Sequence, residues 1–279
     1  MSLFQPFNPD EENVRRRVRP RLAPVPLRSV LPSLVTLLAL CAGLTSIRMT
    51  IEHRYGLAVL LIAVAAALDA IDGRIARLLK STSRFGAELD SIADFVNFGV
   101  APAILVYVWA LADLRSLGWI AALVYVISAA LRLARFNVAL DAPDKPDWQA
   151  RFFVGVPAPA GAVIVMLPLY AEFTALPLPH GFLTAPLVLV YTIAVGLLMV
   201  SRLPTWSGKL IGRRIERERV APLFVGGVLV VAFLVSFPWE TMTALSLVYL
   251  GSLPLAWNAY QRHLRQDPAK TGGPSAGIP

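Results

Sequence analysis

The chain has 279 residues, of which 56% are hydrophobic and only 16% are charged, and its mean hydropathy is +0.62. A soluble domain carries about a quarter charged residues, so this composition excludes an ordinary soluble enzyme. Apolar stretches of about 20 residues, the length that crosses a bilayer as a helix, recur along the whole sequence. We therefore expect an all-α, polytopic transmembrane bundle.

The formal net charge is +8 and the isoelectric point is about 10.1. In a membrane protein such an excess indicates topology and attraction to anionic lipid headgroups. We therefore expect no nucleic-acid partner. The start of the chain lacks the short apolar core and cleavage site of a secretory signal, so the first apolar run is expected to remain as an anchor. Cys41 is the single cysteine and can form no internal disulfide.

The apolar runs predict about eight membrane-spanning helices. They fall near residues 30–47, 56–79, 91–112, 117–137, 157–173, 182–201, 220–237 and 239–260. The last two runs are nearly continuous, and Pro238 must break them.

Arginine and lysine alternate between the two sides of these runs. They cluster before the first run and after the second, fourth, sixth and eighth, whereas the other connections contain few of them. Because positive residues stay on the cytoplasmic side, both termini are expected in the cytoplasm and the protein in the inner (cytoplasmic) membrane.

Four segments are expected along the chain. Residues 1–29 form a basic cytoplasmic segment, which is either an interfacial helix or a solvated arm. Residues 30–205 form the membrane core, and residues 206–262 a basic loop with two further helices. Residues 263–279, rich in Gly, Pro and Ser, are expected to be disordered.

Four aspartates stand at helical spacing where the second and third runs meet: Asp69, Asp72, Asp90 and Asp94. Members of each pair are three or four residues apart and share one helix face. A turn over residues 80–89 is expected to bring the pairs together on antiparallel helices. Carboxylates at a membrane boundary are costly unless paired, hydrated or bound to a cation. Four of them suit one or two hard divalent ions.

Small residues and an arginine accompany these carboxylates. Gly73 and Ala76 allow close approach to the backbone, and Arg77 is a planar donor suited to phosphate. The combination predicts metal-assisted phosphate chemistry on the cytoplasmic side. A divalent-cation transporter would instead need carboxylates at mid-membrane depth and polar residues continuing to the far side. A non-catalytic scaffold would have no use for four aspartates at fixed spacing.

The stretch from Asp69 to Asp94 resembles the signature of the CDP-alcohol phosphotransferase family at every fixed position, and residues 30–205 resemble its six-helix core. The resemblance implies two divalent ions, Mg²⁺ or Mn²⁺, held by Asp69, Asp72, Asp90 and Asp94. It further implies that Asp94 is the general base and that the enzyme is a homodimer. The residues implied to line the CDP-linked donor site are Thr36, Gly73, Ala76, Arg77 and Gly86.

No Cys or His lies near the aspartates to form a covalent phospho-enzyme. Direct attack of an alcohol on phosphorus is therefore favoured, while an aspartyl-phosphate stays open. The first run reads Pro32-Ser33, where the family commonly has Pro-Asn. The role of that asparagine is not carried over to Ser33, because the serine side chain reaches less far.

Three further stretches, 95–103, 132–137 and 153–160, resemble the phosphatidylserine synthase branch of the family. This resemblance implies CDP-diacylglycerol and L-serine as substrates. Arg135 and Asn97, and less directly Arg132, are candidates to bind serine, although the arginines also fit a role as membrane anchors. Sister enzymes that use glycerol 3-phosphate, inositol phosphate or choline are the nearest alternative.

Overall fold

The computed structural model describes residues 27–79, 83–140, 152–174, 184–206 and 217–266. The segment 1–26, where either an interfacial helix or a solvated arm was expected, lies outside the described residues. The same holds for residues 267–279 of the tail.

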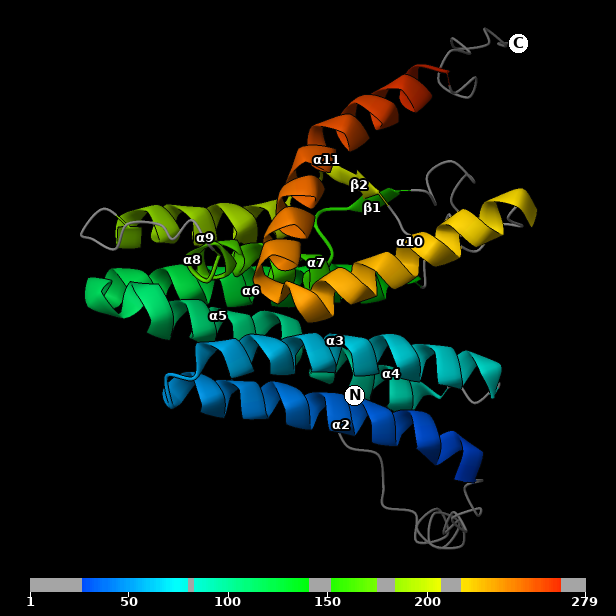
Figure 1. The fold of residues 1–279 in the computed structure, drawn as a ribbon, viewed down its shortest axis with the longest axis horizontal. Coiled ribbons are helices and arrows are strands. Elements are labelled where there is room, and N and C mark those ends of the chain that lie inside the picture. Colours follow the sequence, from blue (N-terminus) through cyan, green and yellow to red (C-terminus); the bar gives the residue numbers. More distant parts are fainter. Residues whose placement is uncertain (1–26, 80–82, 141–151, 175–183, 207–216, 267–279) are drawn as a thin grey trace, which may run out of the picture.

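Helices build almost all of the described structure (Figure 1). Every apolar run is helical over its described part, which confirms the all-α expectation. The helices are α2 (Leu27–Ile51), α3 (Tyr55–Leu78), α4 (Arg84–Asp94), η1 (Phe95–Val100), α5 (Ala101–Val106), η2 (Tyr107–Leu111), η3 (Ala112–Leu114), α6 (Ser116–Leu140), α7 (Ala158–Val165), α8 (Leu167–Glu172), α9 (Thr184–Val200), α10 (Arg217–Ser236) and α11 (Pro238–Gln266).

Several of these helices have the length and apolar character of membrane spans. Four qualify by length and composition: Val30–Ile51, Tyr55–Leu78, Arg84–Leu114 and Ser116–Ala139. Shorter apolar helices cover Ala158–Glu172, Thr184–Val200 and Phe224–Ser236. These findings confirm a polytopic helical membrane protein. The eighth expected span, α11, is long but does not meet the same criterion, so the number of eight crossings stays a prediction.

The expected turn over residues 80–89 is shorter than predicted. Residues 84–89 are helical, because Ser83 caps α4: its side-chain oxygen accepts a hydrogen bond from the backbone N–H of Gly86 at 3.0 Å. A serine cap supplies a partner for one of the free N–H groups in the first helical turn. The helix therefore starts early enough to include Asp90 and Asp94.

A π-helical segment, η1, follows directly after Asp94. The Phe98 carbonyl in this segment accepts a hydrogen bond from the buried Tyr125 hydroxyl of α6 at 2.9 Å. Gly99 lets α6 approach closely, since a Cβ built there would lie 3.2 Å from the Cβ of Ala129. Short π-helical segments are frequently found at functional sites.

Two short strands, β1 (Phe152–Val154) and β2 (Pro204–Trp206), form an antiparallel ribbon that the sequence did not predict. Strands of three residues are too short to show an alternating pattern. The ribbon joins the start of α7 to the end of α9. Gly155 follows β1 with a φ of 77°, and its N–H donates to the Leu203 carbonyl at 2.8 Å.

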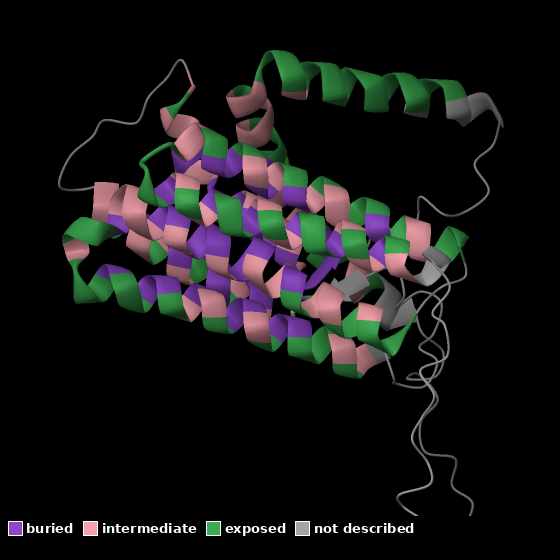
Figure 2. Cartoon of the chain, turned by 90° about the horizontal axis from the view of Figure 1, so that it is seen from below, coloured by how far each residue is buried: buried purple, intermediate pink, exposed green. Residues whose placement is uncertain are grey.

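Most buried residues belong to the bundle of α2 to α9, where Figure 2 colours the ribbon purple. Leu105, Tyr125 and Ile164 are among the fully buried ones. By contrast, the side chains described in α10 are nearly all exposed, and this helix packs mainly on α11. Helix α11 crosses the others at a steep angle and packs on α7, α8 and β2 (Figure 1).

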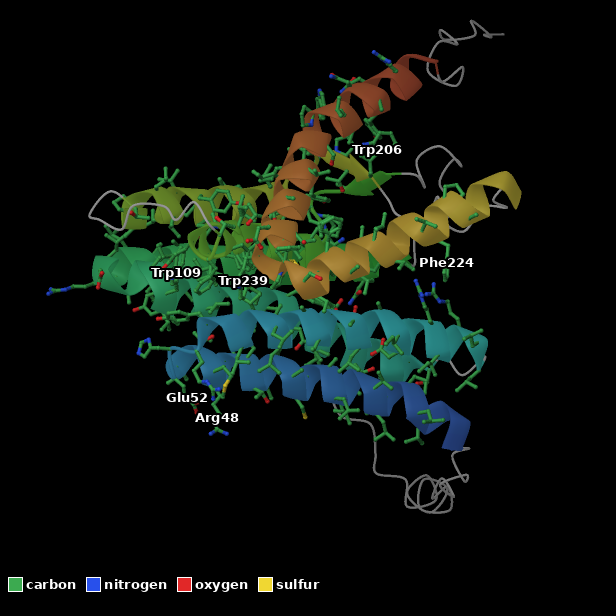
Figure 3. All side chains as sticks on the ribbon, in the orientation of Figure 1. Arg48, Glu52, Trp109, Trp206, Phe224 and Trp239 are labelled. Carbon is green, nitrogen blue, oxygen red and sulfur yellow. The ribbon has the colours of Figure 1, made fainter. Side chains whose placement is uncertain are left out.

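The two ends of the bundle differ in character. One end holds the turn between α2 and α3, where Arg48 and Glu52 form an ion pair at 2.8 Å (Figure 3). At the same end Trp109 Nε1 donates to Glu172 at 2.6 Å. The other end gathers the start of α2, the end of α3, the start of α4 and the β ribbon, and it carries the aspartates.

Candidate metal and substrate site

Three of the four aspartates form an acidic cluster. Asp69 and Asp72 come from the last turns of α3, and Asp90 comes from α4. One carboxylate oxygen from each lies within 4.8 Å of the others. Asp72 is buried, and the other two are half-buried. The antiparallel pairing expected from the sequence therefore brings these residues together.

Asp94 lies one helical turn beyond Asp90 and extends the cluster. Its carboxylate is within hydrogen-bonding reach of the Asp69 carboxylate. Among the described residues, its Oδ1 atom is buried and has no hydrogen-bond partner. Carboxylates this close repel one another unless a cation lies between them. The donor set of hard oxygens and the unpaired Asp94 oxygen therefore fit one or more divalent metal ions.

Thr36 supports the cluster from the neighbouring helix α2. Its hydroxyl donates to Oδ2 of Asp72 at 2.6 Å, and Thr36 itself is buried. Such a contact orients a carboxylate that would bind a metal. The sequence suggested a contact of Thr36 with the nucleotide, and no local pattern indicated this bond, since the two residues are 36 positions apart.

The residues expected to line the nucleotide site surround an open region. A Cβ built on Gly73 would meet no atom within 4 Å, whereas one built on Gly86 would lie 3.1 Å from the capping Ser83 Oγ and 3.8 Å from Ser33 Oγ. Ala76 is half-buried. Arg77 is exposed, and its Nε donates to the Gly73 carbonyl at 3.0 Å. Space and a cation are thus present beside the acidic cluster.

Asn97 is fully buried in η1, close to Asp94 in the chain. It packs against α2 so tightly that a Cβ on Gly43 would overlap its Oδ1 atom. Within the described part of the chain, neither polar atom of its amide has a hydrogen-bond partner. A buried amide without partners is unusual and costly, so it is a candidate contact for a ligand or water.

The two candidate arginines of α6 differ in their surroundings. Arg135 is exposed, and its guanidinium donates to the Val200 carbonyl at the end of α9 at 2.7 Å. Arg132 is buried, lies over the Phe136 ring and interacts electrostatically with Asp94. Of the two, Arg132 is therefore the one placed beside the aspartates. A further residue of this helix, Asn137, donates to Ser91 of α4 at 2.9 Å.

Away from the acidic cluster, the buried face of α3 is apolar. Its buried residues toward the start of the helix are Ala58, Val59, Ile62 and Ala65. A path for ions across the membrane would need polar groups along this face. The aspartates of α3 therefore form a site at one end of the bundle and not a path across the membrane.

Comparisons with known proteins agree with this geometry. A family model described as CDP-alcohol phosphatidyltransferase matches residues 29–200, which include every aspartate of the cluster. A second model, described as CDP-alcohol phosphatidyltransferase 2, matches residues 218–254 in α10 and α11.

Curated relatives cover most of the chain. The CDP-diacylglycerol–serine O-phosphatidyltransferase of Mycobacterium leprae (strain TN) is 41% identical over 242 residues, 85% of this chain and 78% of that protein. The protein of the same name from Mycobacterium tuberculosis (strain ATCC 25618 / H37Rv) is 38% identical over 247 residues, 86% of this chain and 82% of that protein. One from Helicobacter pylori (strain J99 / ATCC 700824) is 35% identical over 175 residues, 62% of this chain and 70% of that protein. The chain thus belongs to the CDP-alcohol phosphatidyltransferase family.

Proposed function

We propose that this integral membrane protein is a CDP-diacylglycerol–serine O-phosphatidyltransferase, which makes phosphatidylserine and CMP from CDP-diacylglycerol and L-serine. The observation that carries the proposal is the acidic cluster of Asp69, Asp72 and Asp90 in a chain 41% identical to an enzyme of that name. The cluster supports phosphate chemistry, and the relatives support serine as the acceptor.

Asp69, Asp72, Asp90 and Asp94 would hold the divalent metal, which we propose to be two ions of Mg²⁺ or Mn²⁺. When bound, the ions supply positive charge that neutralises the donor pyrophosphate and stabilises the departing CMP. Thr36 orients Asp72 for this task through the 2.6 Å hydrogen bond. Four carboxylates match the charge of two divalent ions, which supports this count.

Asp94 is the proposed general base. Its unpaired Oδ1 atom is free to take the proton from the serine hydroxyl. The hydroxyl oxygen then forms a bond to the phosphorus that bears diacylglycerol. The bond from this phosphorus to the CMP oxygen breaks, and CMP leaves with the electron pair.

Substrate contacts follow from the surroundings of the cluster. Gly73, Ala76, Arg77 and Gly86 would border the nucleotide and its phosphates, because this region is open and carries an exposed cation. Asn97, Arg132 and Arg135 are the candidates for serine. Burial beside Asp94 favours Arg132 for direct contact, and the bond of Arg135 to Val200 favours a supporting role.

The cellular arrangement rests on the charge pattern of the sequence. We propose that the protein lies in the inner membrane with the aspartates and both termini on the cytoplasmic side, where positive residues accumulate. Residues 30–205 would form the catalytic core and residues 206–262 an addition to it. A homodimer is proposed from the family resemblance.

The decisive experiment measures CMP release by purified protein in detergent with CDP-diacylglycerol and Mn²⁺. L-Serine, glycerol 3-phosphate, inositol phosphate and choline are offered in turn, and we expect release with L-serine only. Chelation should abolish release, and added Mn²⁺ or Mg²⁺ should restore it. Release with a different acceptor would refute serine specificity, and activity that survives thorough chelation would refute the metal site.

A further inference from the structure

A buried cation near the proposed base has no carboxylate at ion-pair distance among the described residues. Arg132 is only 8% exposed, and its guanidinium carbon lies 5.3 Å from the centre of the Phe136 ring. Its charge interacts with the Asp94 carboxylate. In the described part of the chain, however, no carboxylate lies within ion-pair distance of Arg132. Buried charges in proteins are normally paired at short range, and the described residues offer Arg132 only the more distant Asp94, so this guanidinium can take a further anion.

From the last helix, a buried hydroxyl without a hydrogen-bond partner among the described residues lies within electrostatic reach of Arg132. Tyr249 of α11 interacts electrostatically with Arg132 and lies near the Thr205 side chain of β2. Its hydroxyl oxygen is buried and, among the described residues, has no hydrogen bond of good geometry. The Thr205 hydroxyl already donates to the Gly155 carbonyl at 2.9 Å. The Tyr249 hydroxyl therefore keeps its proton available for another acceptor.

Packing explains why α11 places Tyr249 there. Met242, Tyr249 and Leu253 lie on the face of α11 that packs against the core. Ser246, on the same face, is buried and donates to the carbonyl of Met242 at 2.7 Å. Because Ser246 and Tyr249 are three residues apart, the helix turns both toward the bundle. Contacts of α11 with α7 and β2 hold this orientation.

Arg132, which has no ion-pair partner among the described residues, and Tyr249, which has no hydrogen-bond partner there, have the same chemical need. A guanidinium donates only, and a tyrosine hydroxyl can donate to an oxygen acceptor. Together they match the two oxygens of one carboxylate or two oxygens of a phosphate. The acceptor L-serine carries a carboxylate, and the donor carries phosphates. Because Arg132 interacts with Asp94, the base that must touch the acceptor hydroxyl, the position favours the acceptor.

We propose that Arg132 and Tyr249 together bind the carboxylate of the amino-acid acceptor, so that α11 completes the acceptor pocket. This inference rests on the proposed function and deepens it: an acceptor must carry an anionic group next to its hydroxyl. It also gives the C-terminal helices, which carried no predicted chemistry, a part in substrate selection.

The test is Tyr249→Phe, which removes one hydroxyl and keeps the ring that packs on the core. We expect KM for L-serine to rise about tenfold, the effect of one hydrogen bond to a charged group, while KM for CDP-diacylglycerol stays unchanged. Tyr107→Phe is the matched control. Tyr107 lies in η2 near the opposite end, and its ring contact with Trp119 survives the change. This variant should behave as the unmodified protein.

L-Serinamide separates recognition of the carboxylate from a general defect. With this acceptor, Tyr249→Phe should lose less in kcat/KM than with L-serine, because a neutral amide oxygen accepts a weaker hydrogen bond than a carboxylate oxygen. An equal loss with L-serine and with L-serinamide would overturn the proposal. A rise in KM for CDP-diacylglycerol instead of L-serine would assign the two groups to a donor phosphate and would also overturn it.

The outcomes distinguish this inference from the proposed function. If the unmodified protein releases no CMP with L-serine, the proposed function itself fails. If it does, and Tyr249→Phe keeps the original KM for L-serine, only the role of Tyr249 fails. Should thermal unfolding in detergent show that Tyr249→Phe is misfolded, Arg132→Lys replaces it. The lysine variant keeps the charge but loses the planar pair of donors. The same selective rise in KM for L-serine is expected, and an unchanged KM would contradict the proposal.

Discussion

At the scale of single residues, the site combines carboxylates that are crowded together with one oxygen that is left free. Asp69, Asp72 and Asp90 lie close enough to share a cation, whereas Oδ1 of Asp94 is buried without a hydrogen-bond partner among the described residues. Under the proposed function, one set of aspartates would supply both the metal ligands and the base. The hydroxyl of Thr36 adds a fixed orientation for Asp72.

Asp94→Asn should reduce kcat for CMP release by about 10²–10⁴-fold, because an amide cannot accept the serine proton. Because the asparagine amide has nearly the same shape as the aspartate carboxylate, the fold should stay intact. An unchanged thermal unfolding temperature would show this. Asp113→Asn, an exposed aspartate in η3 near the opposite end, is the control and should retain full activity. Substantial turnover by a folded Asp94→Asn protein would remove Asp94 from the role of base.

Thr36→Val should weaken activation by Mn²⁺ by about 10- to 100-fold, because Asp72 loses the hydrogen bond that orients it. The measurement is the Mn²⁺ concentration that gives half-maximal CMP release. Thr45→Val serves as the control, since the Thr45 hydroxyl donates only to the Cys41 carbonyl of its own helix. Equal Mn²⁺ requirements in both variants would show that Thr36 does not act through Asp72.

At the scale of elements, two irregular pieces shape the end of the bundle that holds the site. The π-helical segment η1 begins immediately after Asp94 and is held by the hydrogen bond of Tyr125 to Phe98. The ribbon of β1 and β2 ties the start of α7 to the end of α9 and gives α11 a surface to pack on. Each element has a glycine where a neighbouring segment comes close: Gly99 in η1 and Gly155 directly after β1.

Gly155→Ala should destabilise the protein by about 1–2 kcal/mol or more, because Gly155 has a φ of 77° and a side chain is strained in that region. A Cβ there would also lie 3.0 Å from the Ser201 carbonyl oxygen. A titration with denaturing detergent measures the effect.

Gly251→Ala in α11 is the matched control. A Cβ there would meet no atom within 4 Å, and alanine favours a helix over glycine by about 0.5–1 kcal/mol. This change should therefore be neutral or slightly stabilising. Equal unfolding midpoints for the two variants would argue against the strained turn at Gly155.

At the scale of the whole molecule, the site lies at one end of an apolar bundle. Four helices are long and apolar enough to cross a membrane, and the buried face of α3 beyond the aspartates is apolar. Arg77 and Arg84, which belong to one of the basic connections of the sequence, lie at the end that holds the aspartates, and this supports the proposed cytoplasmic orientation. The acceptor and donor would then enter from the same side.

Labelling of single cysteines with an impermeant maleimide tests this orientation. In a Cys41→Ser background, Asp113→Cys should react from outside intact cells, and Arg84→Cys should react only after the membrane is opened. Both positions are exposed and lie near opposite ends of the helix that starts at Arg84. The reverse pattern of labelling would place the aspartates on the outer side.

Much of this architecture was predictable because it depends on local pattern. The apolar runs predicted the helices to within a few residues, and the spacing of Asp69 to Asp94 predicted the acidic cluster. The start of α4 was missed because Ser83 caps the helix earlier than expected. The β ribbon was missed because strands of three residues carry no periodic signal.

The sequence by itself determined the helical membrane class, the family and the residues of the acidic cluster, because these depend on composition and on spacing within one or two helices. Only the tertiary structure decided which partners those residues have. Arg132 and Arg135 are three residues apart, yet one is buried near Asp94 and the other is exposed and bonded to Val200. The pairing of Thr36 with Asp72 and the approach of Tyr249 to Arg132 likewise join distant segments. Such contacts depend on how each helix is rotated in the bundle, and packing between segments far apart in the chain sets that rotation.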